Sequence, residues 1–83
     1  MQVRIKNLSG KKLEYKTPGA CAFDFEAFED VTFAPGEWKL VETGTVVETP
    51  EGYVLVAAPR SSIFKNYGLM QVNSVGIVDQ DYR

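Results

Sequence analysis

Hydrophobic and polar residues alternate along most of this 83-residue chain, a pattern typical of half-buried β-strands. The apolar positions that carry the alternation are Val3 and Ile5, Leu13 and Tyr15, Cys21, Phe23, Phe25 and Ala27, Val31 and Phe33, Trp38 and Leu40, Val46, and Val54 and Val56. Successive side chains of a strand point to opposite faces, so each of these segments is expected to bury one face and expose the other.

Turn-forming residues separate these segments at short intervals. They are Ser9-Gly10, Pro18-Gly19, Pro35-Gly36, Thr43-Gly44 and Pro50-Glu51-Gly52. Such short intervals leave no room for crossover helices, so the sheet is expected to be largely antiparallel. The pattern therefore predicts an all-β fold of the sandwich, jelly-roll or barrel kind, in a single domain over residues 1–83.

One segment departs from the alternation. Ser61–Tyr67 lacks a period of two, begins with two serines that are possible N-caps, and is followed by Gly68. These features predict one short helix after Pro59, capped at both ends.

The overall composition excludes several kinds of protein. Apolar residues make up 45% and charged residues 24% of the chain, as in ordinary globular domains. A net charge of −2 argues against a non-specific grip on nucleic acid. No apolar run approaches the roughly 20 residues that cross a bilayer. We expect a cytoplasmic protein that binds neither nucleic acid nor membrane.

The only cysteine is Cys21 and there is no histidine, so a disulfide framework is absent and a structural zinc site is close to excluded. Cys21 itself is expected to be a small core residue. A chain of this size buries only about 60% of its unfolded surface. Oligomerisation is the remaining way to stabilise it.

The missing histidine also limits the catalytic chemistry. Ser-His-Asp and Cys-His machinery is excluded, and the sequence holds no glycine-rich phosphate loop of the Walker or Rossmann kind. A catalytic base would have to be a carboxylate, a lysine or a tyrosine.

The first candidate site is the run Pro59-Arg60-Ser61-Ser62. Serine hydroxyls and open backbone N–H groups at a helix start favour an anion, and a guanidinium matches phosphate oxygens. The alternative interpretation is an ordinary helix cap beside a surface arginine.

The second candidate site is the run Asp79-Gln80-Asp81-Tyr82-Arg83. Asp79 follows the apolar pair Ile77-Val78, so it is expected at or near a strand end. In a regular strand, Asp79 and Asp81 would share one side, opposite Gln80 and Tyr82. The alternative is a turn flanked by acidic residues.

Asp24 is the third candidate. It stands between Phe23 and Phe25, where an unpaired buried carboxylate would be costly. It is expected either to face solvent or to be paired, for example with Arg60.

The order and spacing of these elements resemble the homotrimeric all-β dUTPases (dUTP diphosphatases), a hydrolase family with five ordered motifs. The segments that resemble the first three motifs are Gly19–Ala27, Pro59–Ser62 with Lys65 and Gly68-Leu69, and Asn73 with Gly76–Arg83. The fourth and fifth motifs are absent, so the chain is similar to the N-terminal part of such an enzyme.

The resemblance implies a jelly-roll trimer with active sites between subunits. It also implies cleavage of dUTP to dUMP and pyrophosphate, with Mg²⁺ held by the triphosphate and water and by no protein ligand. Asp79 would deprotonate the attacking water, Tyr82 would stack under the deoxyribose, and Asp24 would be a supporting residue.

The resemblance further implies which residues contact the rest of the nucleotide. Asn73, Gly76, Ile77 and Val78 would line the uracil pocket, and Arg60, Ser61 and Ser62 would hold the phosphates. Two alternatives remain open: a dCTP deaminase of the same fold, and a non-catalytic nucleotide-binding fragment. Pro59 and Gln80-Asp81-Tyr82 disfavour the deaminase, which typically has other residues at these positions.

Overall fold

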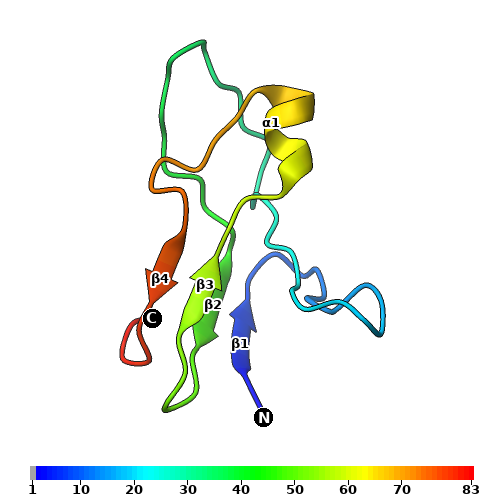
Figure 1. Cartoon of the computed structure of the whole chain (residues 1–83), viewed down its shortest axis with the longest axis vertical. Helices are drawn as coiled ribbons and strands as arrows, with labels where there is room; N and C mark the ends of the chain where they lie inside the picture. The colour runs from blue at the N-terminus through cyan, green and yellow to red at the C-terminus, as the bar shows by residue number, and fades with distance from the viewer. Residues whose placement is uncertain (1) are drawn as a thin grey trace. The chain divides into compact units, whose positions relative to one another are not determined.

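The computed structural model describes residues 2–83. These residues form short strands and one short helix, which run in the order β1 (Arg4–Asn7), β2 (Thr45–Glu48), β3 (Leu55–Ala57), α1 (Ser61–Tyr67) and β4 (Gly76–Val78) (Figure 1). Two units divide the chain, formed mainly by Ile5–Val46 and by Val47–Arg83. No helix among the described residues is long and apolar enough to cross a membrane.

The strands form two small sheets, one of β1 and β2 and one of β3 and β4. In the second sheet the strands are antiparallel, and Val56 faces Ile77 across the pair. The predicted strands around Val46 and Val56 are confirmed, as is an antiparallel pairing. A mostly β chain with one short helix is therefore confirmed in outline.

Several other predicted strands are not formed. In these segments the alternation wrongly predicted a strand with hydrogen-bonded neighbours. They are the segments around Leu13 and Tyr15, Cys21–Ala27, Val31–Phe33 and Trp38–Leu40. Alternation reports which face a side chain occupies, whereas a strand also needs a neighbour that continues the ladder. The N–H of Phe28 donates to the carbonyl of Glu42 (2.7 Å), but this pairing does not extend into a ladder.

The helix α1 has the predicted bounds and the predicted C-terminus. Gly68 is left-handed (φ 67°); its N–H donates to the carbonyl of Phe64 (2.8 Å), and the N–H of Leu69 donates to that of Ile63 (3.4 Å). The prediction of a serine N-cap is wrong, because Arg60 occupies that position in extended conformation and no side chain caps the helix. Ser61 and Ser62 lie inside the first turn, where their hydroxyls are not placed to cap.

Few side chains of the described residues are buried. Val47 is the buried apolar residue, with 8% of its surface exposed, and Thr49 is the buried polar one. Large apolar side chains such as Trp38 and Leu40 are mostly exposed. Local polar contacts therefore carry much of the order within each unit, and ring contacts add to it in the unit Ile5–Val46.

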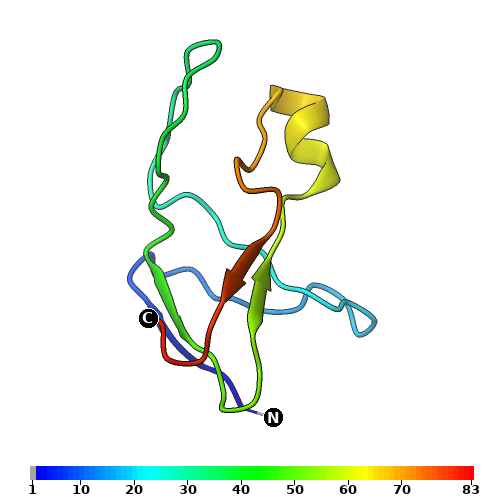
Figure 2. The same cartoon turned by 60° about the vertical axis from the view of Figure 1, so that its left-hand side comes forward.

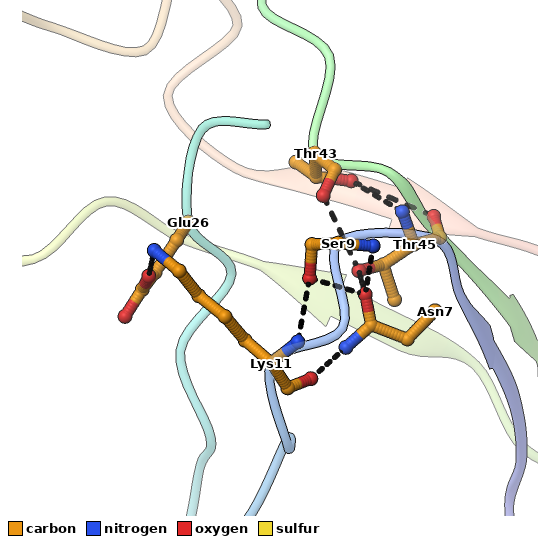
Figure 3. A network of polar contacts seen from close by, with 6 residues as sticks. All are labelled: Asn7, Ser9, Lys11, Glu26, Thr43 and Thr45. Carbon is orange, nitrogen blue, oxygen red and sulfur yellow. Dashed lines mark hydrogen bonds and ion pairs between the residues drawn. The ribbon is translucent and has the colours of Figure 1, made fainter. Parts of the chain in front are cut away.

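The unit Ile5–Val46 is organised around Asn7 (Figure 3). Its Oδ1 accepts hydrogen bonds from the N–H and the hydroxyl of Ser9 (3.0 and 2.6 Å) and from the hydroxyl of Thr45 (3.4 Å), while its Nδ2 donates to the carbonyl of Lys11. The side chain of Lys11 in turn pairs with Glu26 (2.5 Å). One amide thus closes the loop after β1 and ties it to β2.

Aromatic side chains make the other contacts of this unit. The ring of Phe23 meets those of Tyr15 and Phe25 edge to face, at centroid distances of 5.8 and 5.7 Å. Such contacts stabilise extended segments that have no hydrogen-bond ladder.

Candidate functional site

The predicted catalytic carboxylate stands at the end of a strand. β4 ends at Val78, and Asp79 follows it with an exposed side chain. The N–H of Tyr82 donates to the carbonyl of Asp79 (3.1 Å), which closes a four-residue turn. The position at a strand end is confirmed. Of the two alternatives for Asp79–Arg83, the structure shows the turn flanked by acidic residues, and the regular strand does not continue to Tyr82.

A second turn holds this one in place. The N–H of Gly52 donates to Oε1 of Gln80 (2.7 Å). Gly52 has a φ of 83° in the turn closed by the bond from Tyr53 N–H to the Pro50 carbonyl (3.1 Å). Figure 2 shows this turn between β2 and β3 on the same side as the turn after β4. The bond from Gly52 to Gln80 therefore anchors the turn that begins at Asp79.

Arg83 reinforces the same turn. Its Nη1 donates to the carbonyls of Gln80 (2.9 Å) and Tyr82 (3.0 Å), and its Nη2 lies 3.9 Å from Oε1 of Glu48. Sequence reasoning missed the anchoring by Gly52, Gln80 and Arg83. The sequence contains the turn signal Pro50-Glu51-Gly52, but it does not show that this turn contacts Gln80.

The predicted base-binding residues lie around β4 and the loop before it. Asn73 is exposed, and its carbonyl accepts a hydrogen bond from Val75 N–H (2.6 Å) across Ser74, which has a positive φ of 61°. Gly76 and Val78 are half-buried on one side of the strand, whereas Ile77 is 61% exposed on the other.

Gln71 joins this loop to the neighbouring strand. Its Nε2 donates to the carbonyl of Ala57 (3.1 Å) and to Oδ1 of Asn73 (3.0 Å). A Cβ built on Gly76 would lie 3.5–3.7 Å from atoms of Ala57, Gln71 and Asn73, so these groups gather beside Gly76. Sequence reasoning did not single out Gln71.

The predicted phosphate-binding residues are together at the start of α1. Arg60, Ser61 and Ser62 are consecutive and exposed, and the first turn of α1 contains no acidic residue. No side chain caps this end, and the N–H of Ile63 donates to the carbonyl of Arg60 (3.1 Å), so the backbone donors of Ser61 and Ser62 are the ones without a capping side chain. The site thus offers a guanidinium, two hydroxyls and backbone donors.

Asp24 belongs to the unit Ile5–Val46, where it is half-buried. It lines a small cavity together with Lys11, Lys16 and Glu26. The hydrogen bond and the charge of Lys11 lower the pKa of Glu26, and the same hydrogen bond and charge raise the pKa of Lys11. The ion pair of Lys11 and Glu26 therefore lines the same cavity as Asp24.

The described residues hold no group of three His, Cys, Asp or Glu side chains that a metal ion would need. A hard cation such as Mg²⁺ prefers several oxygen ligands. The described residues alone do not supply such a set of carboxylates.

Asp79 follows the end of β4 that pairs with Leu55, whereas α1 begins beyond the opposite end of the β3–β4 sheet, so the structure does not bring the candidate base and the phosphate donors together within one chain (Figure 1). The dUTPase family model matches residues 9–83, and the chain belongs to this family.

Named relatives agree with the family match. A SPbeta prophage-derived deoxyuridine 5'-triphosphate nucleotidohydrolase of Bacillus subtilis (strain 168) is 40% identical over 84 residues, which is 100% of this chain and 59% of that protein. The deoxyuridine 5'-triphosphate nucleotidohydrolase of Anaeromyxobacter sp. (strain Fw109-5) is 42% identical over 86 residues (100% and 58%). That of Nautilia profundicola is 39% identical over 85 residues (100% and 60%). The chain thus spans 58–60% of the length of these relatives.

Proposed function

We propose that this protein is a dUTP diphosphatase that hydrolyses dUTP to dUMP and pyrophosphate. The observation that carries the proposal is the position of Asp79, an exposed carboxylate at the end of β4 in a turn anchored by Gly52, within the segment that matches the family. A base for water must stay accessible and keep a fixed geometry, and this position provides both.

In this mechanism Asp79 accepts the proton of the water that attacks the phosphate chain. Its backbone is held by the bond from Tyr82 and by the contacts of Gln80, which restricts the positions from which the carboxylate can contact the attacking water. Tyr82, whose side chain is 65% exposed, is available to stack under the deoxyribose.

The triphosphate would be bound at the start of α1. Arg60 supplies a planar fork for phosphate oxygens, and Ser61 and Ser62 supply hydroxyl donors. When bound with the triphosphate, Mg²⁺ would neutralise part of the negative charge on the triphosphate oxygens. Asp24 is proposed as a supporting residue for this region, in the unit that carries the first motif.

The uracil would lie against β4 and the loop before it. Gly76 has no side chain, so the base can approach its backbone closely. The backbone of Ile77 and Val78 and the side-chain amide of Asn73 supply polar groups to the edge of the base. This arrangement distinguishes bases by hydrogen bonding rather than by size alone.

The proposal includes the larger assembly. We infer a single jelly-roll domain that forms a homotrimer, as the family resemblance implies, and a cytoplasmic location, as the sequence composition led us to expect. The exposed cross-strand pair of Val56 and Ile77 supports an oligomer, because both side chains are more than half exposed on one face of the β3–β4 sheet. Covering such a pair removes apolar surface from water.

The test is pyrophosphate release with Mg²⁺ and dUTP, dTTP, UTP and dCTP in parallel. Selective turnover of dUTP is expected. Ammonia release from dCTP would instead indicate the deaminase, and binding of a dUTP analogue without turnover of any nucleotide would indicate a binding protein.

The variant Asp79→Asn tests the base itself. Turnover of dUTP is expected to fall by about 10²–10⁴-fold, the usual contribution of a positioned base, while dUTP binding is kept. Asp81→Asn is the matched control because it removes a carboxylate from the same exposed turn. Full activity in Asp79→Asn, or equal losses in both variants, would contradict the role of Asp79.

A further inference from the structure

Two consecutive hydrogen bonds, both through Gln71, link β3 to Asn73. The carbonyl of Ala57 accepts from Nε2 of Gln71 (3.1 Å), and the same Nε2 donates to Oδ1 of Asn73 (3.0 Å). Gln71 is half-buried, while Asn73 is exposed. The amide of Gln71 therefore lies between a fixed main-chain group and a side chain that is open to a ligand.

The direction of these two hydrogen bonds follows from the chemistry of the Ala57 carbonyl. A backbone carbonyl can only accept a hydrogen bond, so Gln71 must turn its NH₂ group toward Ala57. The second hydrogen of that group then points to Asn73, which must accept the hydrogen bond with its side-chain oxygen. This leaves Nδ2 of Asn73 as the outward group, and that atom can only donate.

The free donor lies where the base is proposed to bind. Nδ2 of Asn73 and Nε2 of Gln71 lie 3.7 and 3.6 Å from the position that a Cβ on Gly76 would take. A donor at this place pairs with a carbonyl oxygen and is repelled by an amino group. Uracil carries a carbonyl at the ring position where cytosine carries an amino group.

We propose that Gln71 is a positioning residue that fixes the amide orientation of Asn73, and that it thereby sets the preference for uracil over cytosine. This inference rests on the proposed function and adds a specificity role for a residue outside the predicted site. Without Gln71, the amide of Asn73 can present either its oxygen or its nitrogen to the base, and the discrimination weakens.

The test compares two substitutions with opposite chemistry. Gln71→Met keeps the length of the side chain but has no donor. Gln71→Glu keeps the shape and replaces the donor by an acceptor, to which Asn73 would donate through Nδ2, so that its Oδ1 faces the base. The ratio of kcat/KM for dUTP to that for dCTP is measured, together with the ratio of the Kd values for dUMP and dCMP.

Losing one oriented hydrogen bond is expected to reduce the dUTP-to-dCTP ratio by about tenfold in Gln71→Met. The ratio in Gln71→Glu is expected to fall further, since the acceptor of Asn73 then matches the amino group of cytosine. A general loss of folded protein lowers both rates together and leaves the ratio unchanged. The ratio therefore separates positioning from a purely structural contact.

Asn7→Ala is the matched control, because it removes another side-chain amide that holds backbone groups, in the unit Ile5–Val46. It is expected to lower stability and to leave the ratio unchanged. An unchanged ratio in both Gln71 variants, with a wild type that prefers dUTP, would overturn the role of Gln71 alone.

The two proposals fail in different ways. A wild type that hydrolyses no dUTP but binds dUMP better than dCMP would refute the proposed function, and the ratio of Kd values would then decide the role of Gln71. A wild type without preference in either measurement would refute both.

Discussion

The ring of Phe28 lies against Gly44 so closely that a Cβ built on this glycine would be 2.5 Å from Cδ2 of the ring. Gly44 also has a φ of 68°, a conformation that costs other residues about 1–2 kcal/mol. Gly44→Ala must therefore displace the ring in addition to straining the backbone. We expect it to lower the free energy of unfolding by about 2–4 kcal/mol, as measured by urea denaturation.

Gly36→Ala is the matched control for this prediction. Gly36 has a similar φ of 76°, but a Cβ there would meet nothing within 4 Å. It should show the backbone cost alone, about 1–2 kcal/mol. Equal losses in the two variants would mean that the contact with Phe28 contributes nothing.

Thr49 carries a buried hydroxyl without a hydrogen-bond partner among the described residues. A buried polar group that lacks a partner costs about 1–3 kcal/mol. Thr49→Val keeps the shape of the side chain and removes the hydroxyl, so we expect the free energy of unfolding to rise by about 1 kcal/mol.

The same substitution at Thr43 should lower the free energy of unfolding, the opposite of the change expected for Thr49. The Oγ1 of Thr43 accepts a hydrogen bond from the N–H of Thr45 (3.2 Å), which Thr43→Val would break. We expect a loss of about 1 kcal/mol in the same denaturation experiment. Destabilisation by Thr49→Val would show that its hydroxyl has a partner in solution.

The ion pair of Lys11 and Glu26 predicts a dependence on pH. Its hydrogen bond and charge hold the pKa of Glu26 below the ordinary value of 4.5, so its contribution is present above pH 4.5 and is lost as the pH falls through the folded pKa. The pKa of Lys11 is raised above 10.5, so its contribution is present below pH 10.5 and is lost as the pH rises through the folded value.

In Lys11→Met the pKa of Glu26, followed by NMR of its carboxylate carbon, should return toward 4.5. Glu37 is the internal control. The N–H of Ala34 and the side chain of Lys39 lower its pKa, and neither depends on Lys11. A low pKa of Glu26 that persists in Lys11→Met would show that another group stabilises the carboxylate.

The sequence predicted those features that depend on neighbours along the chain. Helix α1 has the expected bounds because Gly68 ends it, and Asp79 follows a strand because Ile77 and Val78 precede it. Alternation failed around Cys21–Ala27, where side chains alternate but the backbone has no ladder partner. Whether such a partner exists depends on residues far away in the sequence, which periodicity does not report.

The same limit explains which site residues were missed. The run at Arg60 and the carboxylate of Asp79 are visible as motifs, because their chemistry lies in consecutive residues. Gln71 and Gln80 act through backbone groups 14 and 28 positions away, and glutamine has no pattern of its own. Only the folded chain shows that these two amides hold the segments on either side of β4.

Val56 and Ile77 lead to a prediction about assembly. They face each other across the β3–β4 sheet and are 56% and 61% exposed, so a second copy of the chain that covers them would remove apolar surface from water. Val56→Lys would place a charge in that contact, and an unpaired buried charge is costly. We expect the proposed trimer to dissociate at concentrations where the wild type stays assembled, as measured by sedimentation equilibrium.

Val72→Lys is the matched control for assembly. Val72 is 85% exposed, lies in the loop before β4 and has no place in a strand pair, so a charge there should leave the mass of the assembly unchanged. A monomeric wild type, or an assembly that tolerates Val56→Lys, would show that the face formed by Val56 and Ile77 is not the contact between copies. Dissociation by both lysines alike would point to the added charge itself rather than to this face, because only Val56 belongs to the cross-strand pair.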